Sequence, residues 1–319
     1  MTLQEFLLKI SSALAISNSE LLHLIAKAPY SYKSYKIKKK SGGDRVISQP
    51  AKEIKYLQNI IMEAFLNKLP IHECATAYKK GGSIKKNAAA HTSNTYISKF
   101  DLKDFFGSIK ANDVSQHLEK HLNGDLPPAS YQLIARICCI KHKGLEELCL
   151  SIGAPSSPLL SNSIMYEIDQ KISQWCRENQ VTYTRYADDL TFSSNIKGIS
   201  FEIEGLLSDI LSTSQSPRLK INEKKTIHVS KKGTRRVTGI IITNDNKMSL
   251  GRERKRLISA MIHRNLVQRL EEKDIERLQG LLGLAKDIEP IFCARMRKKY
   301  GAAAISEILQ YRREELKED

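Results

Sequence analysis

The stretch VTYTRYADDLTFSS, residues 181–194, places two adjacent acids, Asp188 and Asp189, between runs of β-branched and aromatic residues. Such runs favour strands, whereas Asp is a poor strand former. The pattern therefore predicts two strands that form a hairpin, with the acid pair in its turn. An ordinary Asp-rich turn would have the same appearance, so this stretch alone does not establish a functional site.

A second acid-bearing stretch lies upstream, FDLKDFF at residues 100–106, in which Asp101 ends an apolar segment that is typical of a buried strand. If that strand pairs with the hairpin, the carboxylates of Asp101 and Asp188 converge. Hard divalent cations such as Mg²⁺ prefer oxygen ligands, and two ions about 3.5–4 Å apart stabilise both oxygens of an in-line phosphoryl transfer. We therefore expect one ion to activate a primer hydroxyl and the other to hold the triphosphate and its departing pyrophosphate.

A third stretch, GAPSSP at residues 153–158, leads to Asn162. One Gly and two Pro make a stiff loop that enters a helix, which the serines can cap. Taken alone, this stretch predicts only the start of a helix.

Charge and composition point to a polyanionic partner. The 319 residues include 51 Lys or Arg against 35 Asp or Glu, a net charge of +16, and 41% are hydrophobic, which argues against a disordered chain. Residues 1–100 carry 16 basic residues against 6 acids, and residues 101–200 carry 10 against 12. Basic flanks around an acidic centre suit nucleic acid held around bound cations, although a solvated Lys-rich surface is the alternative.

Other site types and a membrane location find little support. No apolar run approaches the ~20 residues of a membrane span, and no secretion signal is visible. The six cysteines form no C-x-x-C pair and are expected to be reduced in a cytoplasm. His117 and His121 have helical i, i+4 spacing but lack the adjacent Glu of a zincin motif, so two surface histidines are the preferred interpretation.

The periodicity along the chain predicts an α+β fold with a basic hairpin, a strand-rich centre and a helical tail. The expected helices cover residues 3–14, 19–26, 54–69, 157–178 and 201–213, and the chain is helical again after Gly251. The expected strands cover residues 35–40, 45–48, 96–102, 181–186, 190–194, 219–221, 226–230 and 236–242.

Taken together and in this order, the three stretches resemble the motifs of reverse transcriptases: an Asp-x4-Phe strand end, a G-x-P-x-S-P loop, and Y-x-D-D. Asp188 follows Asp101 by 87 residues, an interval that also fits the family. The sequence LKIN at 219–222 with the following KKT at 224–226 resembles the next palm motif, and residues 35–50 resemble the fingers hairpin.

The resemblance covers nearly the whole chain and implies a right-hand polymerase. N-terminal helices and fingers would occupy residues 1–95, and a palm of antiparallel sheet plus helices would occupy 96–250, with fingers elements within about 111–150. Residues 251–319 would form a helical thumb.

Two further elements resemble those of bacterial retron reverse transcriptases. Asn87-Ala88-Ala89-Ala90-His91 is similar to their N-A-x-x-H element, and Val237-Thr238-Gly239 is similar to their V-T-G element. An Ala-rich helix and an ordinary strand are the structural alternatives for these two segments. In the right order around a complete polymerase core, these two elements make the chain resemble a retron reverse transcriptase.

The resemblance implies catalytic roles for four residues. Asp101 and Asp188 would bind the metal ions, and Asp189 would be either a further ligand or structural. Lys225 would protonate the leaving pyrophosphate, with the adjacent Lys224 as the alternative.

The resemblance also implies nucleotide-binding residues. Arg45 stands where the family has a triphosphate-binding Arg, and Lys38, Lys39 and Lys40 are candidates for the triphosphate or the template. Asp104 and Phe105 would offer backbone N–H groups to the triphosphate. Phe106 would be the gate that excludes a ribonucleotide 2′-OH, unless both rings are simply core. The loop with Gly153 and Pro155 would form a wall of the nucleotide pocket.

RNA binding and priming would depend on the retron elements and on basic residues at the start of the thumb. Asn87 and His91 can hydrogen-bond RNA, and a strand can approach closely at Gly239. The residues assigned to this role are Asn87, His91, Val237, Thr238, Gly239, Arg252, Arg254 and Arg256.

One residue departs from the family pattern. Many reverse transcriptases have Gln before the G-x-P loop, where its side chain helps to position the nucleotide or template. This chain has Ile152, which cannot donate that hydrogen bond.

For function, the resemblance implies an RNA-directed DNA polymerase that copies a structured cognate non-coding RNA from an RNA 2′-OH primer. Its product would be branched RNA-linked single-stranded DNA (msDNA), which acts with an accessory effector protein in anti-phage defence. Because retron enzymes lack a ribonuclease H domain, a host ribonuclease H is expected to remove RNA. The alternatives are a mobile-intron type enzyme, an RNA-binding scaffold that sequesters an effector, and a template-independent polymerase.

Overall fold

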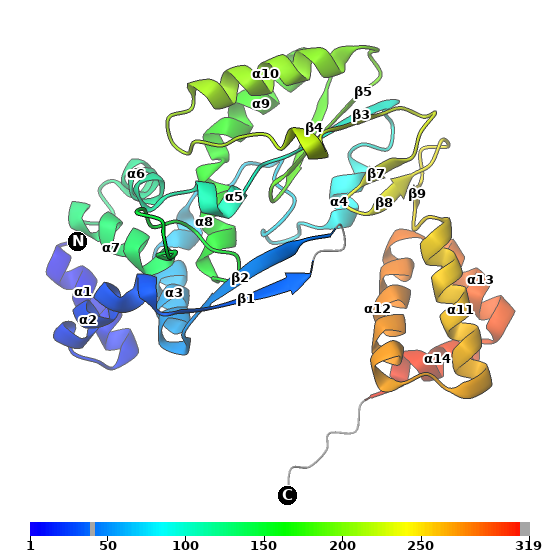
Figure 1. Ribbon diagram of the computed structural model, residues 1–319, viewed down its shortest axis with the longest axis horizontal. Helices are drawn as coiled ribbons and strands as arrows, with labels where there is room; N and C mark the ends of the chain where they lie inside the picture. Colours follow the sequence, from blue (N-terminus) through cyan, green and yellow to red (C-terminus); the bar gives the residue numbers. More distant parts are fainter. Residues whose placement is uncertain (39–41, 313–319) are drawn as a thin grey trace, which may run out of the picture. The chain divides into compact units, whose positions relative to one another are not determined.

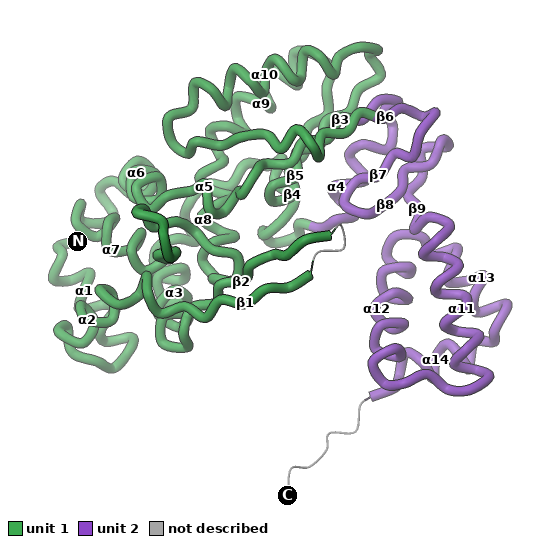
Figure 2. The backbone as a smooth tube through the Cα atoms, in the orientation of Figure 1, with its two compact units in different colours: residues 1–82, 98–228 green, residues 83–97, 229–319 purple. Residues whose placement is uncertain are grey.

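A computed structural model describes residues 1–38 and 42–312. The chain divides into two compact units, each assembled from two segments (Figure 2). The first unit comprises Met1–Gly82 and Ser98–His228, and the second comprises Ser83–Ile97 and Val229–Asp319. Each unit is described by itself below.

The first unit contains a long antiparallel hairpin of β1 (Tyr32–Lys38) and β2 (Asp44–Pro50). Its register runs from Tyr32 opposite Pro50 to Lys38 opposite Asp44. This confirms the expected basic hairpin and its end at Pro50, although the first strand begins three residues earlier than residue 35. Lys39 and Lys40 lie outside the described residues.

The main sheet has the strand order β4-β5-β3-β6. Its strands are β3 (Tyr96–Asp101), β4 (Thr182–Tyr186), β5 (Asp189–Ser194) and β6 (Ile227–Val229). The β4–β5 hairpin is antiparallel, and α9 (Tyr166–Glu178) and α10 (Ile199–Thr213) lie against one face of the sheet (Figure 1). The expected strand at 219–221 is reduced to a single bridge between Leu102 and Ile221.

Helices make up most of the rest of the first unit. Local signals set the first two, because Thr2 with Glu5 and Ser17 with Glu20 form capping boxes. The single helix expected at 157–178 is instead two helices that meet at Met165. The remaining helices are α1 (Leu3–Leu14), α2 (Asn18–Lys27), η1 (Ala28–Tyr30), α3 (Lys52–Ala64), η2 (Leu66–Lys68), α5 (Phe105–Ser108), α6 (Ala111–Leu122), α7 (Pro128–Cys138), α8 (Ser156–Ile164) and η3 (Glu223–Lys225).

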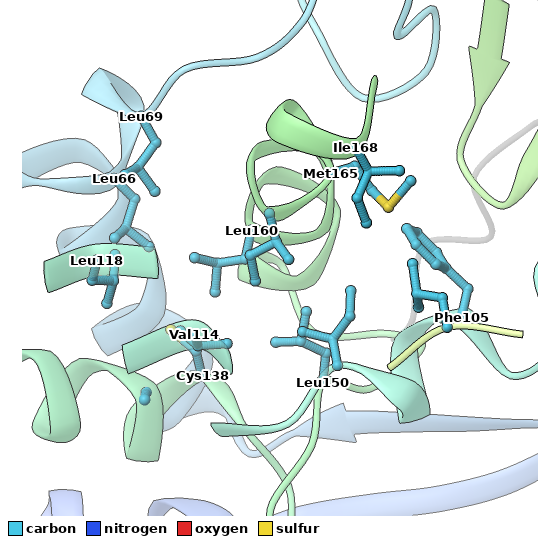
Figure 3. Close-up of a cluster of buried hydrophobic side chains, with 14 of the residues drawn as sticks. Leu66, Leu69, Phe105, Val114, Leu118, Cys138, Leu150, Leu160, Met165 and Ile168 are labelled. Carbon is cyan, nitrogen blue, oxygen red and sulfur yellow. The ribbon is translucent and has the colours of Figure 1, made fainter. Parts of the chain in front are cut away.

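The core of this unit joins helices that are distant in sequence. Leu160 of α8 lies among Leu66, Leu118 and Leu150, and all four side chains are at most 1% exposed (Figure 3). Burying each Leu contributes about 1.5–3 kcal/mol relative to leaving it in water. This packing anchors α8, and with it the loop that precedes the helix.

The second unit has its own apolar core, three short strands and a helical segment. The strand expected over 236–242 is wrong as a single element. It is a hairpin whose two-residue turn, Thr238-Gly239, has positive φ values of 44° and 80°. The helical expectation after Gly251 is confirmed over residues 252–310. The elements are α4 (Ile84–Ala89), β7 (Arg235–Val237), β8 (Ile240–Ile242), β9 (Met248–Ser249), α11 (Arg252–Gln268), α12 (Glu272–Ile288), α13 (Pro290–Tyr300) and α14 (Ala302–Gln310).

Within the described residues, no helix has the length and apolar character needed to cross a membrane. All six cysteines are free thiols, and five of them are buried.

Candidate active site

Three carboxylates gather where the central strands end. Asp101 is the last residue of β3, Asp188 lies in the two-residue turn between β4 and β5, and Asp189 is the first residue of β5. The amide of Leu102 donates to the carbonyl oxygen of Asp188 at 3.0 Å, which ties the end of β3 to the turn. The expected convergence of Asp101 with the Asp188 hairpin is therefore observed.

Asp101 is held by two side chains, one at the end of the LKIN sequence and one in the KKT sequence that follows it. Lys225 Nζ donates to Asp101 Oδ2 at 2.7 Å, and Asn222 Nδ2 donates to Oδ1 at 3.0 Å. The Asn222 amide also donates to the Asp101 carbonyl at 2.8 Å. Of the two lysines that the sequence left open, Lys225 is the one on this carboxylate. The role of Asn222 was missed, although the residue before it, Ile221, bridges to Leu102, directly after Asp101.

Two of the three acids, Asp188 and Asp189, have raised pKa values. Burial, and then the Asp101 carboxylate, raise the pKa of Asp188, while Lys225 and Arg45 partly offset this. Desolvation, followed by the carboxylates of Asp188 and Asp101, raises the pKa of Asp189 to about 6. The cluster is therefore short of positive charge, and a bound cation would stabilise its ionised form.

The carboxylates fit Mg²⁺ in kind, although they do not form a complete cage. Among residues 1–38 and 42–312, no group of three or more His, Cys, Asp or Glu side chains could hold an ion by itself. Mg²⁺ in nucleotide-handling sites is usually bound by one or two carboxylates, with substrate phosphates and water completing the octahedron. Asp101 and Asp188 supply that number of hard oxygen ligands.

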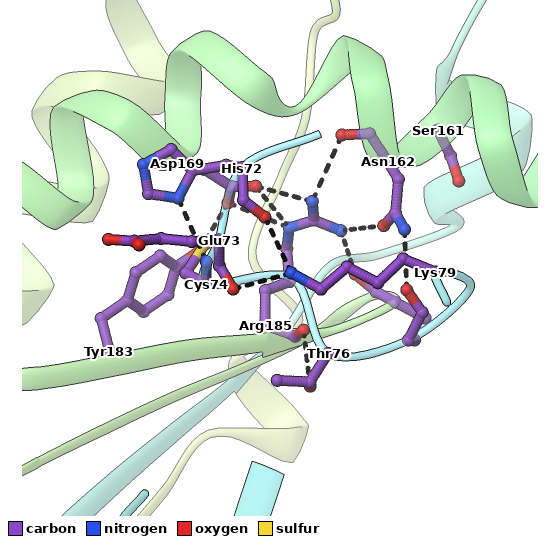
Figure 4. A network of polar contacts seen from close by, with 12 residues as sticks. His72, Glu73, Cys74, Thr76, Lys79, Ser161, Asn162, Asp169, Tyr183 and Arg185 are labelled. Carbon is purple, nitrogen blue, oxygen red and sulfur yellow. Dashed lines mark hydrogen bonds and ion pairs between the residues drawn. The ribbon is translucent and has the colours of Figure 1, made fainter. Parts of the chain in front are cut away.

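A buried ionic network centres on Arg185 and Asp169 (Figure 4). Arg185 and Asp169 are both 0% exposed. Arg185 Nη2 and Nε donate to Asp169 Oδ2 and Oδ1 at 2.6 and 2.9 Å, and the Tyr183 hydroxyl donates to Asp169 Oδ1 at 2.8 Å. Burial opposes the charge of Arg185, but the Asp169 carboxylate outweighs it, so the pKa of the guanidinium is raised.

This network reaches the turn through the third guanidinium nitrogen. Arg185 Nη1 donates to the Ala187 carbonyl at 3.1 Å and to Asn162 Oδ1 at 3.0 Å. Ala187 adopts a φ of 58°, a left-handed conformation that a non-Gly residue rarely takes without support. The hydrogen bond to its carbonyl stabilises that conformation next to Asp188. The sequence offered only a weak signal for this network, an Arg in a strand with otherwise uncharged interior neighbours.

The G-x-P loop is attached to the fingers hairpin. The Ser48 amide donates to the Ile152 carbonyl at 2.7 Å, and Ser151 Oγ donates to the Ser48 carbonyl at 3.2 Å. Gly153 has a φ of +120°, and a Cβ there would stand 2.9 Å from the Ser48 carbonyl oxygen. Gly is therefore required for this close approach. Pro155 precedes the first turn of α8 and is half-buried.

Two adjacent aromatic residues, Phe105 and Phe106, end the stretch that contains Asp101. Asp104 has a φ of 46° and is the N-cap of α5. Phe105 is 3% exposed and belongs to the core, so only its backbone is available to a triphosphate. Phe106 is partly buried, and its ring centroid is 6.5 Å from that of Tyr78, a residue that sequence reasoning missed.

Two of the predicted phosphate-binding cations lie on the hairpin and are exposed. Arg45 of β2 is opposite Ile37, and Lys38 of β1 is opposite Asp44. Arg45 is close enough to the acids to lower the pKa of Asp188. The role of Lys38 in binding the triphosphate or the template stays a prediction, as do the roles proposed for the other nucleotide-binding residues.

The two retron-like elements meet in the second unit. Asn87 Nδ2 donates to Thr238 Oγ1 at 3.4 Å across 151 residues of sequence, and Thr238 Oγ1 donates to the Ile84 carbonyl at 3.2 Å. Asn87, His91 and Val237 are each 0% exposed, and burial lowers the pKa of His91 to about 3. The expectation that Asn87 and His91 hydrogen-bond RNA directly does not match these interior positions. We still predict that Asn87 and His91 influence RNA placement, through the Thr238-Gly239 turn that they support.

A basic cleft opens beside this turn. Its volume is about 770 Å³, and Gly239 lies on its wall. Arg254 Nη1 donates to the Gly239 carbonyl at 3.2 Å. Arg256 lies outside the cleft, on a neighbouring hollow with His263 and Tyr300. The basic residues that line the cleft are Lys231, Lys232, Arg236, Arg252, Arg254 and Lys255.

Comparison with known proteins identifies the family. A family model described as "Reverse transcriptase (RNA-dependent DNA polymerase)" matches residues 37–242. The retron Ec83 reverse transcriptase of Escherichia coli is 39% identical over 282 residues, which are 88% of this chain and 90% of that protein. The retron Ec73 reverse transcriptase of Escherichia coli is 35% identical over 86% of this chain and 89% of its own length.

Solved structures resemble the chain more distantly. Telomerase from Candida albicans, in complex with a fragment of telomeric RNA, has a TM-score of 0.48 at 14% identity and covers 88% of this chain and 61% of its own. The foamy viral protease-reverse transcriptase with an RNA/DNA hybrid has a TM-score of 0.45 at 14% identity, over 88% of this chain and 33% of its own.

The matched region begins in the fingers hairpin and contains the three acids, the G-x-P loop and the Lys225 segment. The chain therefore has the right-hand polymerase fold of this family and the RNA-directed DNA polymerase activity that goes with it. The chain belongs to the reverse transcriptase family and, within it, to the bacterial retron reverse transcriptases.

Proposed function

We propose that this reverse transcriptase copies a cognate structured RNA from an RNA 2′-OH and produces msDNA, the branched RNA-linked single-stranded DNA. The observation that carries the polymerase part of the proposal is the convergence of Asp101 and Asp188 at the ends of paired strands. The contact between Asn87 and Thr238 supports the retron-specific part, because it joins the two elements that set this group apart.

The acid cluster would hold two Mg²⁺ ions through Asp101 and Asp188, with Asp189 as a further ligand or a neighbouring charge. When bound, the ions supply charge stabilisation to the attacking and leaving oxygens of nucleotidyl transfer. Lys225 lies against Asp101 and can give a proton to departing pyrophosphate. The raised pKa values of Asp188 and Asp189 support cation binding, because positive charge relieves the repulsion among the carboxylates.

The nucleotide pocket would lie between the fingers hairpin and the acids. Arg45 would bind the triphosphate, and Lys38 would bind either the triphosphate or the template backbone. The backbone amides at Asp104 and Phe105 would face the phosphates, and Phe106 would exclude a ribonucleotide 2′-OH. The close contact of Gly153 with β2 supports the G-x-P loop as a rigid wall of this pocket.

The basic cleft of the second unit would bind the cognate RNA through its phosphates. Six Lys or Arg side chains line it, and affinity for RNA should therefore fall steeply as salt rises. Thr238 and Gly239 would present the turn to the RNA, with Asn87, His91 and Val237 holding it from the interior.

We further propose the cellular setting that retron enzymes share. The msDNA would act with an accessory effector protein in anti-phage defence, and a host ribonuclease H would remove copied RNA. The cytoplasm is a suitable compartment because its thiols stay reduced, and all six cysteines here are free.

An RNA-binding scaffold with a dispensable polymerase is the second candidate. The basic cleft favours it, since binding needs no catalysis. The complete acid set with its Lys225 and Asn222 contacts favours the polymerase, because a scaffold has no need of it.

Two substrates test the retron-specific part. The double change Asn87→Ala with His91→Ala should impair self-primed synthesis on RNA that copurifies with the protein far more than extension of a supplied primer on an unrelated template. Sequencing that RNA identifies the template. Equal losses in both assays would show that these residues serve the fold or general catalysis, and would contradict the proposed role.

A further inference from the structure

Tyr78 is an exposed aromatic residue at the edge of the acid site. Its side chain is 48% exposed, and its ring centroid is 6.5 Å from that of Phe106 at an angle of 51°. Burial of its hydroxyl, and then the nearby Asp188 and Tyr186, raise the pKa of Tyr78. The ring therefore lies within electrostatic reach of an acid and beside the residue expected to select the sugar.

The backbone at Tyr78 is strained. Its φ is 56°, a left-handed conformation that disfavours any residue with a Cβ and that a bulky ring rarely adopts. A Gly at this position would carry no such strain, yet the chain has Tyr. Strain of this kind is concentrated at functional sites, where surrounding contacts maintain it.

The buried Arg185 network supplies those contacts. Asn162 Nδ2 donates to the Ala77 carbonyl at 2.8 Å, next to the strained residue. The Thr76 amide and hydroxyl both donate to the Arg185 carbonyl, at 2.8 and 3.0 Å. Figure 4 shows Thr76, Asn162 and Arg185 joined in this way. The same network therefore supports the turn before Asp188 and the segment that ends at Tyr78.

The segment is also closed on its far side. The Gly82 amide donates to the Lys79 carbonyl at 3.0 Å, and Lys79 Nζ donates to the Glu73 carbonyl at 2.9 Å. A Cβ at Gly82 would stand 2.4 Å from the Thr76 carbonyl oxygen, so the loop is tight. These contacts fix the backbone, while half of the Tyr78 ring stays open to solvent.

A role in packing does not account for this arrangement. A ring that stabilises the core is buried, as Phe105 is at 3%, whereas Tyr78 leaves half of its surface uncovered. A surface residue without a function needs neither a strained backbone nor a buried network beneath it. What the ring faces is the side of Phe106 and the acid-bearing turn.

We propose that Tyr78 is a substrate-contacting residue, whose ring forms with Phe106 a two-ring wall for the sugar and base of the incoming deoxynucleotide. Aromatic rings suit this task, because every base has a face on which a ring can stack whatever its sequence. The inference rests on the proposed nucleotide pocket and adds a residue to it.

The test compares four variants in extension of a supplied primer on an unrelated template with Mg²⁺. Tyr78→Ala should raise the KM for deoxynucleotide about tenfold, with kcat within about threefold of the wild type, since the loss is one of ground-state and transition-state binding alike. Tyr78→Phe should keep a KM near the wild-type value. Tyr78→Gly removes the ring and also the strain, so it should fold at least as stably as Tyr78→Ala and show the same rise in KM. Tyr56→Ala is the matched control, since Tyr56 is a 56% exposed Tyr on α3.

Each outcome separates the roles. An unchanged nucleotide KM in Tyr78→Gly would overturn the proposal, as would a loss confined to kcat or to affinity for the primer–template. Inactivity of both the wild type and Tyr56→Ala would overturn the proposed function and this inference with it. Activity in those two with a rise in KM only in the ring-deleted variants would support both.

Discussion

Replacing Arg185 with Met removes a fully buried guanidinium and leaves its partner, Asp169, as an unpaired buried carboxylate. Breaking a buried ion pair from one side costs about 3–5 kcal/mol. The Tyr183 hydroxyl still donates to Asp169, but the bonds from Nη2 and Nε at 2.6 and 2.9 Å are lost. Because a domain has only about 5–15 kcal/mol of stability, we expect Arg185→Met to lower the urea midpoint strongly or to prevent folding.

The double change Arg185→Met with Asp169→Leu separates stability from positioning. Apolar side chains that replace both partners of a buried pair can restore stability. They cannot restore the hydrogen bond to the Ala187 carbonyl, so the turn that carries Asp188 loses its support. A displacement of about 1 Å at a reacting group can cost about 10²-fold in rate. We expect the double variant to fold and to show kcat reduced by about that factor.

The assay pairs urea unfolding with extension of a supplied primer. Arg235→Met is the matched control, because Arg235 is also a large buried cation, 1% exposed, and belongs to the second unit. It should lose stability and keep its kcat on an unrelated template. A folded double variant with wild-type kcat would refute the positioning role of Arg185, and a cost below about 1 kcal/mol for Arg185→Met would refute the energetic argument.

Four other substitutions give distinct expected results. Phe106→Ala should increase ribonucleotide relative to deoxyribonucleotide incorporation, because exclusion by a ring is steric; unchanged discrimination in a folded variant would rule out the gate. Gly153→Ala places a Cβ 2.9 Å from the Ser48 carbonyl oxygen at a φ of +120°, so it should lower the thermal midpoint and raise the nucleotide KM. Gly205→Ala is the control, because Gly205 lies in a helix and no atom is near the new Cβ. This variant should raise the free energy of unfolding by about 0.5–1 kcal/mol, and a loss of stability equal to that of Gly153→Ala would contradict the steric argument. His91 has a pKa of about 3 in the folded chain, below the ordinary 6.5, so stability should fall as pH drops from 6.5 towards 3, by at most ~1.4 kcal/mol per unit. His91→Gln should flatten that dependence in urea titrations at pH 7 and 5, and an unchanged slope would contradict the assignment.

Much of the fold and the acid site could be predicted because their signals are local. The runs of β-branched and aromatic residues on either side of Asp188 predicted the hairpin, and the apolar run before Asp101 predicted its neighbouring strand. The hairpin at Thr238-Gly239 was missed because the β-branched residues Val237, Thr238 and Ile240 surround Gly239 and hide the turn. A periodicity that continues across two elements gives no sign of the break between them.

The supports of the site could not be predicted, because each depends on contacts between distant segments. The sequence around Arg185 indicates only a strand, and its contact with Asp169 exists only in the folded chain. The sequence around Tyr78 gives no sign of its positive φ. Asn87 and His91 are polar and were expected to hydrogen-bond RNA, yet tertiary packing places both in the interior. Burial of a polar residue depends on the fold as a whole and leaves little trace in its own neighbourhood.

The most direct test of the central claim is primer extension with Mg²⁺ by Asp188→Asn and Asp101→Asn. Each change removes a negative oxygen ligand from the cluster, which should cost several kcal/mol of transition-state stabilisation and abolish DNA synthesis, while RNA binding stays largely intact. Asp209→Asn, an exposed acid on α10, should remain fully active. Near-normal extension by either purified active-site variant would contradict the assignment of these carboxylates as the catalytic centre.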